Sequence, residues 1–421
     1  MPPDSPGLLR RLWSAIGPGV ITGAADDDPS GIATYSIAGA QLGTGMLWTA
    51  LLTWPLMVAV QLACARIGMV TGAGLTTALR RKFPRWLVIF VAVALLAANV
   101  INIGADLAAM SDAAALLTGT RSHWLVIAAF GLTIGWATVY LRYATIAQVL
   151  KWLCISLFAY IVAGIRLGPD WAAVAYATFV PSMPRGHDGW STLVAILGTT
   201  ISPYLFFWQA SQEVEEEKLH GHLTVRSRRG ATDAQLTNRR LDVTMGGFFS
   251  NLVMYFIILT TALTLHVHGI TDISTSAQVA KALEPLAGKF STFLYTAGVI
   301  GTGLLAVPVL AGSAAYALAE IFDWRQGIDA QARRAPAFYL VIGLAVAGGA
   351  TMDLVKLNPI HTLFVTAVIN GLLAPVLLVG ILAVATDGKL MQNQPVSRLS
   401  LVLVVIAAAL MTVAGIALFV V

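Results

Sequence analysis

The chain has 421 residues, of which 57% are hydrophobic and only 11% are charged, and its mean hydropathy is +0.78. A soluble globular domain does not reach these values, so the composition excludes that class and indicates an integral membrane protein. The net charge of +5 alone would suit a nucleic-acid-binding protein, but most Lys and Arg residues lie in short segments between apolar runs, which leaves that function without support.

The N-terminal segment does not resemble a secretory signal peptide. Residues 2–11 are polar, and the apolar run after them leads directly into three aspartates. We therefore expect the first membrane span to stay in the mature protein. Both cysteines, Cys64 and Cys154, lie in apolar stretches, which predicts buried thiols and neither a disulfide nor a structural metal site.

Eleven apolar runs are long enough to cross about 30 Å of hydrocarbon as helices of about 20 residues. Uninterrupted runs of this length exclude the alternating pattern of a β-barrel, so the expected fold is an all-α membrane protein. Basic residues gather on one side of the predicted spans, which places the N-terminus in the cytoplasm and the C-terminus outside, in a bacterial inner membrane. The runs cover residues 13–43, 46–70, 86–116, 123–140, 144–166, 190–212, 242–268, 291–320, 336–352, 357–384 and 399–420.

Two of these spans are interrupted at corresponding places. The first contains "DDDPSG" and the sixth contains "TTISPY", residues 199–204. Proline removes a backbone donor and clashes with the preceding turn, so each is a break point. Paired interruptions in two halves are the best sequence indication of a transporter binding site at the membrane midplane.

This pairing predicts the organisation of the chain. We expect a single transporter domain over residues 1–421, with five-helix repeats at 13–166 and 190–384 and an additional helix at 399–420. The long polar segment 213–240 carries "EVEEEKLHGH" and "RSRRG" without apolar periodicity, which predicts a cytoplasmic connection.

A broken helix with an adjacent carboxylate is suited to binding a hard cation. Unwound backbone exposes carbonyl oxygens, a carboxylate adds a full negative charge, and Mg²⁺, Ca²⁺ and Mn²⁺ prefer such oxygen ligands. The alternative is that Asp26 to Asp28 only cap a helix end near the interface. About a dozen mostly apolar residues lie on each side of the break, which favours the functional interpretation.

The stretch "GPGVITGAADDDPSGIATYSIAGAQLGTGMLW", residues 17–48, resembles the first span of the natural resistance-associated macrophage protein (Nramp) family of divalent-metal transporters. That family shows GPG, eight residues, then DPGN-IAT and AGAQ-G. "LGTTISPYLFFWQAS" resembles the family's sixth span, where Met-Pro-His marks the break. The resemblance implies a LeuT-like 5+5 inverted repeat with discontinuous helices 1 and 6, and it places Asp28 on the metal-binding aspartate.

The resemblance also implies the surroundings of the metal. Carbonyl oxygens near Ala25 and Thr199 and the hydroxyl of Ser202 would join Asp28 as ligands. Further polar groups are predicted around them, although a packing role is as reasonable for the Asn370 amide. This outer group consists of Asp27, Gly31, Thr200, Tyr204 and Asn370.

Departures from the family pattern bear on the transported ion. Gly31 replaces the family's Asn and Ser202 replaces its Met, so a soft thioether that favours Mn²⁺, Fe²⁺ and Cd²⁺ is absent. Space for retained water suits Mg²⁺, which dehydrates reluctantly. The pattern therefore resembles the family's magnesium-transporting branch more than its transition-metal branch.

The proton-coupling residues of the family are only half present. Asp106 in "GADLA" matches an acidic position of the family's proton path, but Ala109 and Tyr204 replace its Glu and His. Tyrosine, with an ordinary pKa near 10, is a poor proton carrier at neutral pH. This argues against proton symport.

Three alternatives to a magnesium-preferring transporter remain. The first is a proton-coupled Mn²⁺ or Fe²⁺ symporter of the ordinary Nramp type. The second is a sodium-coupled organic-solute symporter, which would want exposed backbone donors rather than three aspartates. The third is a membrane enzyme or scaffold, but no span holds a nucleophile with a positioned base, so we expect no enzyme and no cofactor. The expected partners are the metal ion and the lipid bilayer.

Overall fold

The computed structural model describes residues 26–120, 122–141, 145, 155–328, 330–355 and 358–421, and every regular element within these ranges is a helix. The longer ones are α3 (Pro29–Leu42), α4 (Leu47–Thr71), α6 (Arg85–Thr118), α7 (His123–Tyr140), α9 (Phe158–Arg166), α11 (Gly186–Thr200), α12 (Pro203–Leu219), α13 (Asp233–Thr264), α16 (Ser291–Ile321), α17 (Pro336–Thr351), α18 (Pro359–Ala385) and α19 (Arg398–Val420). Shorter helices are α5 (Leu75–Arg80), α10 (Trp171–Phe179), α14 (Ser276–Lys281) and α15 (Glu284–Ala287).

The described helices agree with the predicted spans. Eight helical stretches in the described chain are long and apolar enough to cross a membrane. Eleven spans were expected, and the difference has three causes. The stretch Pro29–Thr71 contains two predicted spans, α17 is short at 16 residues, and ten residues of the predicted span 144–166 lie outside the described part.

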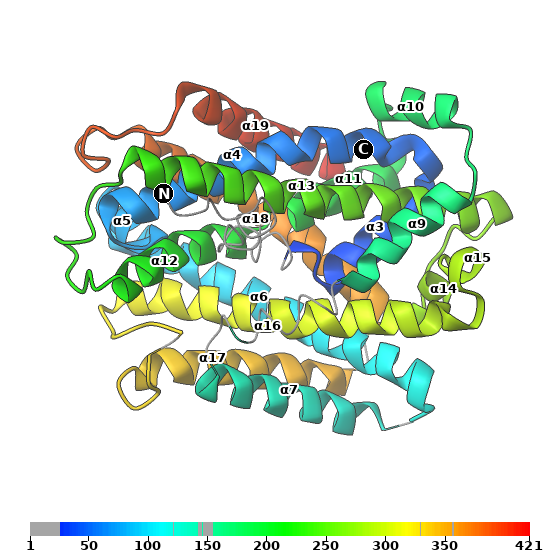
Figure 1. Cartoon of the computed structure of the whole chain (residues 1–421), viewed down its shortest axis with the longest axis horizontal. Coiled ribbons are helices and arrows are strands. Elements are labelled where there is room, and N and C mark those ends of the chain that lie inside the picture. The colour runs from blue at the N-terminus through cyan, green and yellow to red at the C-terminus, as the bar shows by residue number, and fades with distance from the viewer. Residues whose placement is uncertain (1–25, 121, 142–144, 146–154, 329, 356–357) are drawn as a thin grey trace, which may run out of the picture.

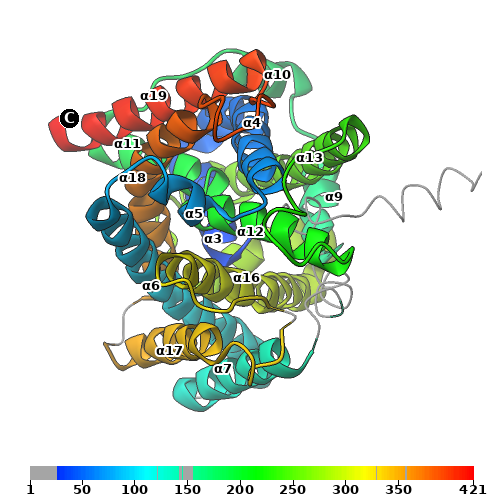
Figure 2. The same ribbon diagram turned by 90° about the vertical axis from the view of Figure 1, so that its left-hand side faces the viewer.

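The long helices form a bundle with two short helices at its centre. In Figures 1 and 2, α3 and α12 lie in the interior, α7 and α17 lie together at one margin, and α19 lies at the opposite margin. All but the last two residues of α3 are buried. Large apolar side chains such as Phe90, Leu132 and Val405 are exposed on the outer helices, as expected for a surface that faces lipid. The polar centre therefore lies inside an apolar shell.

The predicted connection at 213–240 was set too wide. Helix α12 continues to Leu219 and α13 begins at Asp233, so only residues 220–232 lie between them. The acidic run stays helical because Arg239 of α13 pairs with Glu213 at 2.6 Å and also with Glu216. Glu213 is only 2% exposed, so this part of the run is not a solvated face.

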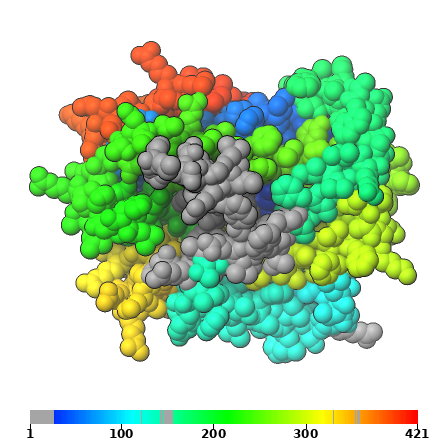
Figure 3. Space-filling model, viewed as in Figure 1, coloured from blue at the N-terminus to red at the C-terminus, as the bar shows by residue number. Residues whose placement is uncertain are grey.

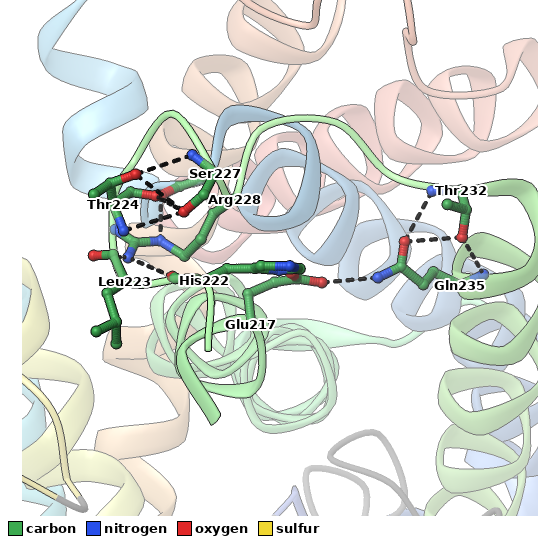
Figure 4. Close-up of polar contacts among 9 residues, drawn as sticks. Glu217, His222, Leu223, Thr224, Ser227, Arg228, Thr232 and Gln235 are labelled. Atoms are coloured by element: carbon green, nitrogen blue, oxygen red, sulfur yellow. Dashed lines mark hydrogen bonds and ion pairs between the residues drawn. The ribbon is translucent and has the colours of Figure 1, made fainter. Parts of the chain in front are cut away.

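Residues 220–232, which connect α12 to α13, are hydrogen-bonded to the end of α4 through Arg228. Its Nε donates to the carbonyl of Gly72 at 3.2 Å, and its terminal nitrogen donates to the carbonyls of His222 and Leu223 at 3.1 and 2.8 Å (Figure 4). The connection is therefore an ordered part of the fold.

A capping box begins α13 on the other side of this connection. The Thr232 hydroxyl accepts from the Gln235 backbone N–H at 3.3 Å, and the Gln235 side chain accepts from the Thr232 N–H at 2.9 Å (Figure 4). The Gln235 amide also donates to Glu217 of α12 at 2.8 Å. A side-chain hydrogen bond therefore joins the end of α12 to the start of α13, on either side of residues 220–232.

One of the two cysteines, both predicted to be buried thiols, lies within the described residues. Cys64 is a free thiol, fully buried in α4. Cys154 lies outside the described residues.

Candidate functional site

The first helix break lies at the aspartate triplet. The backbone is helical at Asp26, leaves the helix at Asp27 and Asp28, and is helical again from Pro29. Asp28 is the N-cap of α3, and its Oδ1 accepts a hydrogen bond from the Gly31 N–H at 2.8 Å. Asp28 is nevertheless only 1% exposed. Asp28 therefore caps a helix, as the capping alternative expected, and the cap is buried in the interior of the bundle.

The second break lies between α11 and α12. Helix α11 ends at Thr200, and Ser202 is the N-cap of α12 with an extended backbone, φ −78° and ψ 129°. The Ser202 hydroxyl donates to the carbonyls of Gly198 at 3.0 Å and Thr199 at 2.5 Å. Two carbonyl oxygens near the end of α11 therefore point toward the break. The break predicted at residues 199–204 is confirmed.

The two breaks meet across Gly31. A Cβ at this position would lie 3.4 Å from the Asp26 carbonyl oxygen and 3.4 Å from the Thr199 hydroxyl oxygen. Next to this contact, the Tyr35 and Thr200 hydroxyls lie 3.3 Å apart. The tightest contact of such a Cβ is 3.3 Å to the Tyr35 ring, so a small side chain would require a shift of only a few tenths of an ångström. Gly31 therefore marks the place where the two breaks lie close together.

Asp28 receives two further side-chain hydrogen bonds from other helices. Its Oδ2 accepts from Tyr204 of α12 at 3.4 Å and from the Asn102 amide of α6 at 3.2 Å. The Asn102 carbonyl oxygen accepts from the Thr366 hydroxyl of α18 at 2.8 Å. These donors, and Ser30, which also hydrogen-bonds the Asp28 carboxyl group, are neutral, so no cationic side chain pairs with Asp28 among the described residues.

Asn102 was not identified from the sequence. It lies in a continuous apolar run, and the signal that could have found it is its spacing of four residues from Asp106, which puts both on one face of α6. Thr366 gives no comparable signal, because threonine is common in apolar helices as a donor to its own backbone. It does donate to the Leu363 carbonyl, at 2.7 Å.

Two predicted residues present buried oxygen atoms without hydrogen-bond partners. Both carboxylate oxygens of Asp106 and the amide oxygen of Asn370 have no partner among the described residues. The two side chains are 0% and 2% exposed. Buried oxygens of this kind are normally compensated by a proton, ordered water or a cation. Asp106 and Asn370 therefore place hydrogen-bond acceptors without partners among the described residues in the interior of the bundle.

Asp26 and Asp27 are directed to a different helix from Asp28. The Ser250 hydroxyl of α13 lies 2.8 Å from Asp26 Oδ2 and 3.2 Å from Asp27 Oδ1. Both aspartates are buried. The role of Asp27 beside the metal stays a prediction, and Ala25 lies outside the described residues.

The breaks bring together carboxylate, carbonyl and hydroxyl oxygen atoms, which are possible ligands of a metal ion. Across the described residues, no group of three or more His, Cys, Asp or Glu side chains is arranged to hold a metal ion. The groups that contact the Asp28 carboxylate include the Gly31 N–H, the Asn102 amide and the Tyr204 hydroxyl, whereas the carbonyls of Gly198 and Thr199 lie at the second break. Carboxylate, carbonyl and hydroxyl oxygens are the ligands that a hard cation prefers.

A cavity lies beside α3 and α11, which adjoin the breaks, and beside α18. It has a volume of about 400 Å³, and its lining includes Ile37 of α3, Ser191 of α11 and Phe364 of α18. These residues lie about two turns along their helices from Asp28, Thr199 and Asn370. The carboxylates of Asp188 and Asp272 also face it.

The fold and the site together define a class: a multi-pass helical membrane protein in which two discontinuous helices enclose a buried polar centre. A model of the family described as "Natural resistance-associated macrophage protein-like" matches residues 19–421. The chain belongs to this family, as the sequence motifs predicted.

Curated relatives match over most of the chain. The divalent metal cation transporter MntH of Caldanaerobacter subterraneus subsp. tengcongensis is 26% identical over 94% of this chain and 91% of its own length. MntH of Deinococcus radiodurans is 27% identical over 73% of this chain and 69% of its own.

Solved structures show the fold. The Eremococcus coleocola manganese transporter, in complex with an aromatic bis-isothiourea substituted compound, is similar with a TM-score of 0.76 at 16% identity, over 99% of this chain and 88% of that one. The inward-facing conformation of Mhp1 is similar with a TM-score of 0.54 at 15% identity, over 96% and 89% of the two chains. The predicted LeuT-like fold with discontinuous first and sixth helices is confirmed. Its division into repeats at 13–166 and 190–384 stays a prediction.

Proposed function

We propose that this chain transports divalent cations across the membrane by alternating access, and that it prefers Mg²⁺ to Mn²⁺. The ion would bind between the two helix breaks, against Asp28, the carbonyls at the end of α11 and the Ser202 hydroxyl. Family membership and the names of the MntH relatives support a divalent-metal substrate. The observation that carries the proposal is the Asp28 carboxylate, 1% exposed at the junction of the breaks and hydrogen-bonded only to neutral donors.

The donor atoms support a hard ion. Ser202 offers a hydroxyl oxygen at the place where the family has a thioether, so no soft ligand favours Mn²⁺ or Cd²⁺ there. The space beside Gly31 is no larger than a small side chain in this structure, because Tyr35, Asp26 and Thr199 lie 3.3–3.4 Å from the position of a Cβ there. Room for a water molecule on Mg²⁺ would therefore have to come from separation of the two breaks as the ion enters.

The groups near Asp28 support transport without proton coupling. Tyr204, which replaces the family's His, donates its hydroxyl hydrogen to Asp28 and so acts as a hydrogen-bond donor. The membrane potential can supply the driving force instead. A dication moving inward gains about 4.6 kcal/mol per 100 mV, twice the value for a unit charge.

Competition between ions tests the proposed selectivity. The purified chain in liposomes should take up Mg²⁺ with saturation, and millimolar Mg²⁺ should suppress Mn²⁺ uptake. Liposomes with the Asp28→Ala variant provide the background. Saturable Mn²⁺ uptake that millimolar Mg²⁺ leaves unchanged would instead support an ordinary manganese transporter, the substrate named for the Eremococcus coleocola neighbour.

A further inference from the structure

A groove of about 740 Å³ runs along the outside of the bundle between α4, α13 and α19. Helix α4 forms its floor, because it packs against both α13 and α19. Figure 3 shows α4, in blue, at the surface between α19 and α13. All three helices are long and apolar enough to cross a membrane, so the groove opens toward lipid.

Most of the groove is apolar and follows one face of α4. Trp54, Val58 and Leu62 line it at intervals of four residues, and Leu399 and Leu403 of α19 line the opposite side. From Trp54 to Met69 the stripe extends about 22 Å at 1.5 Å per residue, which is longer than half of a 30 Å hydrocarbon core. An acyl chain from one leaflet can lie along it.

One end of the groove is basic. Arg66 lies five residues before the end of α4 and lines the groove together with Arg240 of α13. The Arg66 Nε donates to the Gln394 carbonyl at 3.1 Å, but its terminal nitrogens have no hydrogen bond or ion pair within the described ranges. Arg240 is exposed and likewise has no ion-pair partner in the described chain.

Among the charged side chains that line the groove, arginines outnumber carboxylates. Arg239 also lines it, but its guanidinium is engaged by Glu213, Glu216 and Asp242, none of which is a lining residue. Asp233 is the carboxylate that lines the groove and faces Arg66. Two guanidinium groups therefore share one carboxylate at the edge of a lipid-facing groove.

We infer that this groove binds an anionic phospholipid, with an acyl chain along the α4 stripe and the phosphate on Arg66 and Arg240. An arginine inside a membrane-spanning helix is costly unless it is paired. Guanidinium groups bind phosphate oxygens through two parallel hydrogen bonds, and basic pockets between membrane helices select anionic head groups. A zwitterionic head group would bring its own cation toward two arginines and is less suitable.

The inference is independent of the proposed transport function, because it concerns binding on the outer surface. A structural link between the two exists, since α13 also carries Ser250, which contacts Asp26 and Asp27. Binding is therefore measured directly rather than through transport.

The test is a titration of the purified, delipidated full chain with phosphatidylglycerol, followed by native mass spectrometry and by thermal unfolding. In the Arg66→Gln/Arg240→Gln variant we expect affinity to fall about fivefold per guanidinium, so about 25-fold in total. The Arg333→Gln/Arg334→Gln variant removes the same charge from an exposed pair just before α17, at the opposite margin, and should bind as the wild type does. Equal affinity in all three proteins would overturn the inference.

Two further arms separate lipid binding from misfolding and from binding of a soluble anion. Arg66→Lys/Arg240→Lys keeps the charge and should retain most of the affinity, whereas Leu62→Trp fills the apolar groove with the charges intact and should lose it. Glycerol 3-phosphate has the head-group charge without acyl chains and should neither stabilise the protein nor displace the lipid. Displacement by glycerol 3-phosphate, or equal binding of phosphatidylcholine, would contradict an anionic-lipid site.

Discussion

Asp28 combines two roles that usually lie in different parts of a membrane protein. It caps α3 through the Gly31 N–H, and its second oxygen accepts from Asn102 and Tyr204. A full charge held only by neutral donors in the interior is expensive, so a bound cation would lower its free energy. The cap also fixes the direction of the carboxylate before any ion arrives.

Replacement of Asp28 by alanine and by asparagine separates these roles. Asp28→Ala removes the charge and should reduce ion uptake to the background of protein-free liposomes, while loss of the cap should lower stability by about 1 kcal/mol. Asp28→Asn keeps a good capping residue and should also abolish uptake. The measurements are liposome flux and thermal unfolding, and unchanged flux in either variant would place the ion elsewhere.

Ser202 tests the choice of ion at the second break. Ser202→Met introduces the thioether that the family has at this position and removes the bonds to the Gly198 and Thr199 carbonyls. We expect Cd²⁺ to compete with Mg²⁺ uptake about tenfold more strongly, which corresponds to 1.4 kcal/mol of binding free energy. Ser202→Ala serves as the control, because it removes the same bonds without adding sulfur. Equal Cd²⁺ competition in the two variants would exclude a ligand role for position 202.

At the scale of elements, both helix breaks could be predicted because proline and the aspartates act locally, through a missing N–H and a side-chain cap. The helical ends of the segment 213–240 could not be predicted. They depend on the ion pair between Arg239 and Glu213, which lie more than twenty residues apart along the chain. Asn102 was missed for the same reason, since its partners Asp28 and Thr366 come from two other helices. The sequence shows which residues are polar, but their partners depend on tertiary packing.

The Arg239 cluster should contribute strongly to stability. Arg239 pairs with Glu213 and Asp242, which are 2% and 6% exposed, so Arg239→Met leaves buried charge without compensation. We expect a loss of about 3–5 kcal/mol in the free energy of unfolding, measured by denaturation in detergent. Removal of Arg239 together with its most buried partner, in Glu213→Met/Arg239→Met, should cost less than the single change, because one buried carboxylate fewer is left without compensation. As a control, Arg334→Met alters an exposed arginine and should stay within about 0.5 kcal/mol.

A surface ion pair links the turn after α5 to the segment after α18. Lys82 donates to Asp387 at 2.8 Å, and the backbone N–H groups of Lys389 and Leu390 also donate to this carboxylate. The Lys82 hydrogen bond, followed by that of the Leu390 N–H, lowers the Asp387 pKa from 3.8 to about 2. Because the pKa is lower in the folded protein, the stabilisation is complete above the ordinary pKa and disappears as pH falls toward 2.

Asp387→Asn should therefore lower the unfolding temperature slightly at pH 7, and the difference from the wild type should shrink between pH 4 and pH 2. Thermal unfolding in detergent across this range measures it. Asp323→Asn is a suitable comparison, because Arg80 lowers the pKa of that exposed carboxyl in the same way. A difference that grows toward low pH would contradict the assignment.

On the scale of the whole molecule, a buried polar centre lies within an apolar shell, and a cavity approaches it along α3, α11 and α18. The sequence predicted this shell from run lengths and the centre from two interruptions. The packing of α3 against α11 at Gly31 depends on distances between segments far apart in the chain, so only the structure provides it.

The energy source for transport depends on the net charge that crosses the whole molecule with each ion. If Tyr204 only donates a hydrogen bond to Asp28, each transported dication carries two charges and no proton. At 100 mV the gain of about 4.6 kcal/mol allows about a thousandfold accumulation or more. In liposomes with a potassium diffusion potential, the logarithm of the Mg²⁺ accumulation ratio should therefore rise in proportion to that potential, and collapse of the pH gradient should not change the rate. An internal pH dye decides between the mechanisms, because acidification that follows metal entry would show that Asp106 or another buried acid carries a proton across with the ion.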